Sequence, residues 1–215
     1  MDFVYPKVCV GCGIDGTFLC NECFENLEIA GQICPVCGVV SDMGWTHKDC
    51  RKKGGLDGLI CIYSYQDELV KKVIDEIKFG FNQELIYEML RNFRFESGER
   101  FDMIVPLPLH FYRENWRGFN QADLIGQELE KGLGIGLEKV LVRHKMTKQQ
   151  SALSDRKERE ENLKDAFVLK NGATIKGKKM LLVDDVFTSG ASMKEATVTL
   201  KRAGAETVWG LVLAH

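Results

Sequence analysis

Apolar residues follow two alternating patterns along the chain after residue 55. Short unbroken apolar runs predict buried strands, and apolar residues spaced three and four positions apart predict amphipathic helices. Strands are expected at 59–65, 102–106, 140–142, 180–183 and 207–213, and helices at 69–77, 85–93, 121–131 and 191–203. Strands that alternate with helices indicate an α/β domain with a mostly parallel sheet that helices cover on both faces.

The segment before residue 55 lacks this alternation and carries seven of the eight cysteines. Six of them form three Cys-x-x-Cys pairs, and the seventh shares that spacing with a histidine. Four such pairs provide enough ligands for two tetrahedral zinc sites. A sequential assignment groups Cys9, Cys12, Cys20 and Cys23 around one ion, and Cys34, Cys37, His47 and Cys50 around the other. The spacing also allows interleaved pairs, and because the second site depends on one histidine, one or two zinc ions are expected.

Zinc is favoured over a disulfide framework. The N-terminus has neither the basic stretch nor the apolar stretch of an export signal, so a cytoplasmic location is expected, where thiols are kept reduced. Glycines after Cys12 and Cys37 suit tight turns whose backbone amides point at sulfur. The remaining thiol, Cys61, lies in an apolar run and is expected to be buried and inert. The sequence therefore predicts a double zinc ribbon over 1–55, with residues 51–55 as a linker, and an α/β domain over 56–215.

The charge of the chain limits the classes of partner that it is expected to bind. The chain has 29 Lys and Arg against 31 Asp and Glu, a net charge of −2, which gives no general attraction to nucleic acid or anionic membranes. Residues 1–55 contain five basic and seven acidic side chains, which favours a structural role for the ribbon over a DNA-binding finger. No apolar run is long enough to span a membrane, so no membrane insertion is expected.

Two adjacent carboxylates, Asp184 and Asp185, follow the uniformly apolar run 180–183. This places them at the carboxyl end of a strand, where open α/β sheets bind ligands. A turn of small residues then leads into the predicted helix, and its amides and hydroxyls suit a single phosphate. The residues of this turn are Thr188, Ser189, Gly190, Ala191 and Ser192. The turn lacks the Gly-Lys-Ser/Thr ending of a Walker loop.

The acidic pair indicates that the ligand carries hydroxyl groups as well as a phosphate. Carboxylates repel a phosphate, but they accept hydrogen bonds from vicinal diols and tolerate an Mg²⁺ ion that bridges a diol and a polyphosphate. An alternative is a helix N-cap with acidic compensation of the helix dipole, which would account for only one of the two aspartates. The ligand predicted from these residues is a ribose 5-phosphate.

The stretch 181–192, LLVDDVFTSGAS, resembles the phosphoribosyl-pyrophosphate (PRPP) signature of type I phosphoribosyltransferases. Other motifs are similar to the ComF family of competence-associated phosphoribosyltransferases, which also carries an N-terminal zinc ribbon. These motifs are Arg117-Gly-Phe-Asn-Gln121 after Val105-Pro-Leu-Pro108, and Thr147-x-x-Gln150-x-x-Leu153 followed by Arg159 and Asn162. The resemblance implies a type I phosphoribosyltransferase-like fold, PRPP with Mg²⁺ as ligand, and a role in DNA uptake during natural transformation.

The resemblance also implies roles for individual residues. Asp184, Asp185 and Arg117 would form the catalytic group. In type I enzymes the loop after an early strand contacts pyrophosphate, and Leu107 and Pro108 stand where that loop is expected. Arg113 and Arg117 would supply positive charge to the leaving pyrophosphate. The alternative for 117–121 is a helix start capped by Asn120, and both roles are compatible.

The segment 139–164 contains eight Lys and Arg against four Asp and Glu. The resemblance implies a mobile lid here, which would bring Arg143 and Arg159 to the polyphosphate and exclude water. A solvated charged loop is the alternative.

Two functions stay open from the sequence. The first is a Mg²⁺-dependent phosphoribosyltransferase whose acceptor nothing in the sequence identifies. The second is a catalytically idle accessory module that senses PRPP or binds single-stranded DNA, with other competence proteins as partners.

Overall fold

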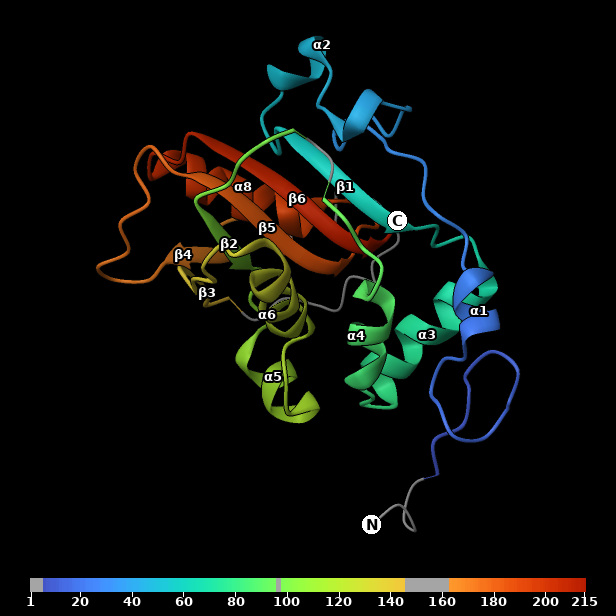
Figure 1. The fold of residues 1–215 in the computed structure, drawn as a ribbon. Coiled ribbons are helices and arrows are strands. Elements are labelled where there is room, and N and C mark those ends of the chain that lie inside the picture. The colour runs from blue at the N-terminus through green and yellow to red at the C-terminus, as the bar shows by residue number, and fades with distance from the viewer. Residues whose placement is uncertain (1–5, 96–97, 146–162) are drawn as a thin grey trace.

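The computed structural model describes residues 6–95, 98–145 and 163–215, and its centre is a four-stranded parallel sheet (Figure 1). The strand order is β1 (Gly58–Tyr63), β6 (Thr207–Ala214), β5 (Lys179–Val186) and β2 (Met103–Pro106). Because every neighbouring pair is parallel, the carboxyl ends of the four strands meet at one edge of the sheet.

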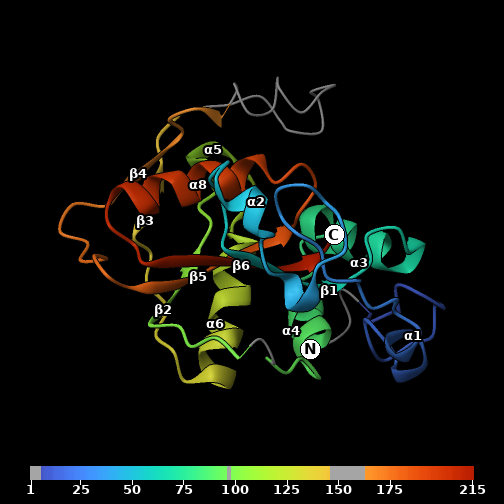
Figure 2. The same ribbon diagram turned by 90° about the horizontal axis from the view of Figure 1, so that it is seen from above.

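Helices cover both faces of this sheet. Figure 2 shows α8 (Ala191–Arg202) on one face and α4 (Glu84–Leu90) and α6 (Gln121–Leu133) on the other. Two further helices, α3 (Glu68–Phe79) and α5 (Phe111–Arg117), follow β1 and β2 respectively. No helix in the described ranges is both long enough and apolar enough to cross a membrane.

The apolar pattern explains why these segments fold as they do. Met180–Val183 in β5 are completely buried, as expected for a central strand covered on both faces. Helix α3 buries one stripe of apolar residues and begins at Asp67, whose side chain accepts a hydrogen bond from the backbone N–H of Leu69. The predicted α/β architecture, with its parallel sheet flanked by helices, is therefore confirmed.

Three local features differ from the prediction. The strand expected at 140–142 becomes β3 (Leu141–Arg143), which pairs antiparallel with β4 (Phe167–Leu169) outside the main sheet. Strand β5 continues through both aspartates, and Asp184 pairs with Val212 of β6. Helix α5 was not predicted, because its large rings, among them Phe111 and Trp116, are exposed and give no buried apolar stripe.

The described part of the cysteine-rich segment, from residue 6 onward, folds into short helical pieces joined by loops, and it runs along the open edge of β1. These pieces are α1 (Asn21–Glu25), the 3₁₀ helix η1 (Asp42–Gly44) and α2 (Lys48–Arg51). The Gln32 side chain bonds to both backbone groups of Cys61, with distances of 2.7 and 3.1 Å. The rings of Trp45 and Trp209 meet edge to face with their centroids 4.6 Å apart. The segment therefore shields an edge strand that would otherwise be open to pairing.

Candidate functional site

A cleft of about 570 Å³ opens at the carboxyl edge of the sheet. The end of β5, the turn that leads into α8, the loop after β2 and one side of α3 form its walls. Eleven of the predicted ligand-binding residues line it: Leu107, Pro108, Arg117, Arg143, Asp184, Asp185, Thr188, Ser189, Gly190, Ala191 and Ser192. Of the other two, Arg113 lies within α5 and Arg159 falls outside the described residues. The structure thus brings together residues that are up to 85 positions apart in sequence, from 107 to 192.

The two carboxylates differ in their surroundings. Asp185 forms an ion pair with Lys78 of α3, with 3.4 Å between Nζ and Oδ1, and both side chains are largely buried. Asp184 accepts a hydrogen bond of 2.9 Å from the backbone N–H of Asp185. Burial of the Asp184 carboxyl, together with the charge of Asp185, raises its pKa to about 7, although Lys78 and Arg143 act in the opposite direction. The two carboxyl groups can therefore accept hydrogen bonds from a ligand or bind a cation.

The turn over 188–192, which we call the phosphate loop, depends on a glycine. Gly190 has a φ of +70°, and a Cβ atom built there would lie 2.4 Å from Cζ of Phe187. Only glycine adopts this conformation and fits this space without strain. Gly190 precedes α8 and has no side chain to cap it, and the Ser189 hydroxyl accepts a long hydrogen bond of 3.4 Å from the backbone N–H of Ala191. The start of α8 borders the cleft, where its remaining amides suit an anion.

Arg117 and Gln121 form a second polar group at the cleft. Arg117 Nη1 donates to Gln121 Oε1 at 2.9 Å. Within the described part of the chain, Arg117 Nε and Gln121 Nε2 are buried without a hydrogen-bond partner. Burial lowers the pKa of Arg117, whereas the charges of Asp185 and Asp184 raise it. Buried donors without a partner are costly, and because Arg117 lines the cleft, an acceptor on a bound ligand would satisfy its Nε.

Asn120 performs the capping role that was the alternative for 117–121. Its Oδ1 accepts from the backbone N–H of Ala122 at 3.2 Å and starts α6. Its Nδ2 donates to the carbonyl oxygen of Leu107 at 3.1 Å. The cap thus also anchors the loop after β2, and it leaves the Arg117 side chain directed to the cleft.

Sequence reasoning missed eight further residues that line the cleft. Four of them are direct neighbours of predicted residues, Leu109, Val186, Phe187 and Met193, and the other four come from the region after β1: Tyr65, Asp75, Lys78 and Phe79. The last three share one side of α3 because they are spaced three and four positions apart. In the sequence, Asp75 and Lys78 look like part of an ordinary solvated helix face, and nothing nearby signals that α3 borders a site. Only the tertiary contact with Asp185 reveals it.

The metal-ligand residues form two separate groups, as the sequential assignment predicted. The ligand atoms of each group lie within 4.8 Å of one another. The first group is Cys9, Cys12, Cys20 and Cys23, and the second is Cys34, Cys37, His47 and Cys50. The Sγ atoms of Cys12 and Cys20 are 3.7 Å apart, far beyond a disulfide bond length. Four thiols, or three thiols and an imidazole, are donor sets that suit tetrahedral Zn²⁺.

The thiols within each group differ in their pKa. Burial and neighbouring cysteines raise the pKa of Cys23 to about 12 and that of Cys50 to about 11. Burial alone would raise the pKa of Cys9, but hydrogen bonds from backbone N–H groups lower it to about 6 overall. The glycines after Cys12 and Cys37 have φ values of +79° and +74°, so the predicted tight turns are present. Cys61 belongs to neither group, and burial raises its pKa to about 12, which agrees with an inert thiol.

Comparison with known proteins gives matches to both parts of the chain. Residues 1–51 match the double zinc ribbon domain family, and residues 117–214 match the phosphoribosyl transferase domain family. Competence protein F of Haemophilus influenzae is 32% identical over 224 residues, covering 96% of this chain and 90% of that protein. DNA utilization protein YhgH of Escherichia coli K12 is 31% identical over 88% of this chain and 87% of its own. Competence protein ComFC of Bacillus subtilis is 28% identical over 86% of this chain and 79% of its own.

Proposed function

The chain belongs to the family of competence protein F, ComFC and YhgH, and we propose that its cleft binds PRPP together with Mg²⁺. The observation that carries this proposal is one cleft that holds an acidic pair, a glycine-containing helix start and two arginines. A ligand with a phosphate, ribose hydroxyls and a pyrophosphate complements these three groups at once.

Each part of PRPP has a counterpart in the cleft. The 5′-phosphate would lie on the phosphate loop, bound by first-turn amides of α8 and by hydroxyls of Thr188 and Ser192. The ribose hydroxyls would donate to Asp184 and Asp185. The pyrophosphate would lie between the loop at Leu107–Pro108 and the cationic side chains of the cleft, Arg117 and Arg143. Arg113 and the lid residue Arg159 are proposed to join them when the ligand is bound.

The reaction that this arrangement favours is transfer of the phosphoribosyl group. The bond between the anomeric carbon and the pyrophosphate oxygen breaks, and pyrophosphate leaves with the bonding electrons. Arg117 and Arg143 would stabilise the charge that develops on it, and bound Mg²⁺ would supply further charge neutralisation. A nitrogen nucleophile then bonds to the anomeric carbon and releases a proton. The chain's own contribution is orientation and electrostatic stabilisation rather than covalent catalysis.

Pyrophosphate release tests the catalytic part of this proposal. Purified protein with PRPP and Mg²⁺ would be screened against nucleobases, amines and single-stranded DNA. We expect acceptor-dependent release with at least one class, and loss of release in Arg117→Met. Release that is absent with every class, although PRPP binds, would support the idle PRPP-sensing module instead.

An exposed aromatic surface favours a second function, binding of single-stranded DNA. It comprises Phe79, Phe81, Phe111, Tyr112 and Trp116, with exposed fractions between 44% and 65%. The rings of Phe81 and Trp116 are 5.5 Å apart, and Phe79 also lines the cleft beside Arg117. Exposed rings next to cationic groups are a common platform for stacked bases. The basic segment 139–164, expected as a lid or patch, lies largely outside the described residues.

Titration of a fluorescent oligonucleotide at several salt concentrations tests this second function. We expect Trp116→Ala to weaken binding about tenfold, since stacking contributes ~1–3 kcal/mol per base. Tyr87→Ala, which removes another exposed ring, serves as the matched control. Equal affinity of both variants, or no binding even at low salt, would reject the aromatic surface as the DNA site.

The cellular role is also a proposal. The relatives are named for competence and for DNA utilization, and we extend a role in DNA uptake to this chain, in the cytoplasm and together with other competence proteins. We also retain the division into a zinc ribbon over 1–55 and a phosphoribosyltransferase-like domain over 56–215.

A further inference from the structure

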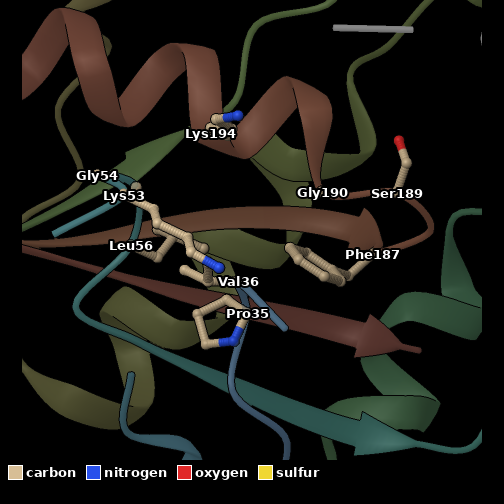
Figure 3. A pocket seen from close by; sticks show the side chains of 10 residues that line it. Pro35, Val36, Lys53, Gly54, Leu56, Phe187, Ser189, Gly190 and Lys194 are labelled. Carbon is tan, nitrogen blue, oxygen red and sulfur yellow. The ribbon is translucent and has the colours of Figure 1, made fainter. Parts of the chain in front are cut away.

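A second cavity, of about 240 Å³, borders the phosphate loop at Ser189 and Gly190 (Figure 3). Three segments that are far apart in sequence enclose it. They are Pro35 and Val36 between two ligands of the second zinc group, residues 53–56 from the end of the linker to the first residue after it, and Phe187, Ser189 and Gly190 with Lys194 of α8. Because the zinc ribbon supplies one wall, the cavity exists only in a chain that has both parts. We call it the ribbon cavity.

The apolar walls of the ribbon cavity are well fixed. Leu56 and Phe187 are only 4% and 7% exposed, and in Figure 3 the Phe187 ring lies opposite Leu56 and Val36. The Phe187 ring packs directly on Gly190 and lies 6.0 Å from the ring of His215. A ring held from two sides offers a rigid, flat apolar surface, which suits a planar group of a ligand.

The polar lining of the ribbon cavity is cationic. Lys53 and Lys194 approach it from the linker and from α8, whereas Figure 3 shows the Ser189 hydroxyl directed away from the cavity. Figure 3 shows the Lys53 side chain directed into the cavity toward Phe187. None of the ten described residues that line the cavity is acidic. Two lysines suit an anionic group such as a phosphate or carboxylate.

We propose that the ribbon cavity binds a small anion that carries a planar ring, of the nucleoside monophosphate class. The ring would pack on Phe187 between Val36 and Leu56, and the phosphate would pair with Lys53 and Lys194. A volume of about 240 Å³ is close to the lower end for ligand pockets, which favours a single small molecule. The cavity is separate from the cleft but shares the lining residues Phe187, Ser189 and Gly190 with it. The inference does not depend on PRPP binding.

Titration of adenosine 5′-monophosphate (AMP) into the full-length, zinc-loaded protein tests this inference. We expect Lys53→Ala to weaken AMP binding about tenfold or more, because a charged partner of the phosphate is lost. Lys52→Ala is the matched control, since Lys52 is an exposed neighbour outside the cavity lining. Adenosine and inorganic phosphate should each bind much more weakly than AMP, because each lacks one half of the recognised group.

A nucleotide could also enter the cleft, so the location of bound AMP must be read directly. Methyl resonances of Val36 and Leu56 report on the ribbon cavity, and those of Thr188 and Leu107 report on the cleft. The proposal requires AMP to shift the Val36 and Leu56 signals in a Lys53-dependent manner. It is overturned if AMP does not bind, if Lys53→Ala binds like the wild type, or if only the cleft signals move. We expect Lys53→Ala to bind PRPP with unchanged affinity. AMP binding in the ribbon cavity and PRPP binding in the cleft are then independent, and either proposal can fail without the other.

Discussion

At the scale of single residues, the carboxyl group of Asp184 has the most unusual environment in the cleft. It stands beside a second carboxylate at the end of a buried strand, and burial together with the charge of Asp185 raises its pKa from 3.8 to about 7. Lys78 and Arg143 are the cations that oppose this shift. A group whose pKa is raised by folding links the stability of the protein to pH.

The sign of this linkage is fixed by the direction of the shift. Between about pH 4 and pH 7 the folded state keeps the proton on Asp184 while the unfolded state loses it, so stability falls as pH rises through this window. We predict that Asp184→Asn, which cannot ionise, loses this part of the pH dependence. Urea unfolding of the wild type and of Asp184→Asn from pH 5.5 to 7.5 measures this pH dependence. If the free energies of unfolding of the two proteins differ by the same amount over the whole range, the pKa of Asp184 is not raised.

Gly190 allows a second prediction at this scale. Gly190→Ala is expected to cost ~1–2 kcal/mol of stability for the left-handed backbone, with a further cost from the contact with the Phe187 ring, and to weaken PRPP binding. Gly172→Ala is the matched control, because Gly172 has a φ of +83° but nothing within 4 Å of the added Cβ. Urea unfolding of the two variants compares them. Equal losses of stability would show that the Phe187 ring does not constrain the loop.

At the scale of secondary-structure elements, the strong patterns could be read from the sequence and the weak ones could not. The all-apolar run of β5, followed by two acids and a glycine turn, identifies both the central strand and the phosphate loop. Strand β4 has only three residues, Phe167–Leu169, which is too short for a periodic signal. The large apolar side chains of α5 are exposed, so they do not form the buried stripe from which a helix is recognised in a sequence. The Lys78–Asp185 ion pair joins residues 107 positions apart, so only the tertiary fold reveals the role of α3.

The zinc knuckles lead to a prediction at the element scale. The two ligand groups predict two zinc ions per chain, and Cys12→Ser is expected to lower the content by one ion. Cys61→Ser should keep both ions, because Cys61 belongs to neither group. Zinc analysis by mass spectrometry under native conditions checks these numbers. A wild-type content near one ion would mean that the group with His47 does not hold zinc.

At the scale of the whole molecule, the zinc ribbon packs against the domain that it precedes. It contacts the edge strand β1 through Gln32, covers Trp209 with Trp45, and forms one wall of the ribbon cavity. The first zinc group is attached to helix α4, where the guanidinium of Arg91 lies 3.7 Å above the ring of Phe24. The ribbon thus stabilises the sheet that carries the cleft, which the division of the sequence at residue 55 does not suggest.

This arrangement predicts that residues 56–215 are unstable on their own. Removal of 1–55 exposes the edge of β1 and the ring of Trp209, both of which are buried in the full chain. Limited proteolysis and thermal unfolding of the fragment and the full chain compare them, and we expect the fragment to be digested faster and to melt at a lower temperature. A fragment as stable as the full chain would show that the ribbon is an independent appendage.

The proposed function requires the acidic pair and the phosphate loop to bind one PRPP molecule together. Calorimetric titration of PRPP with Mg²⁺ into the full chain measures this binding, beside Asp184→Asn combined with Asp185→Asn and beside Asp49→Asn as a control outside the cleft. We expect one PRPP per chain for the wild type and the control, and at least about tenfold weaker binding for the double variant, with its zinc content and fold retained. A wild type that does not bind PRPP, or a double variant that binds it as tightly as the wild type, would show that the cleft is not the PRPP site.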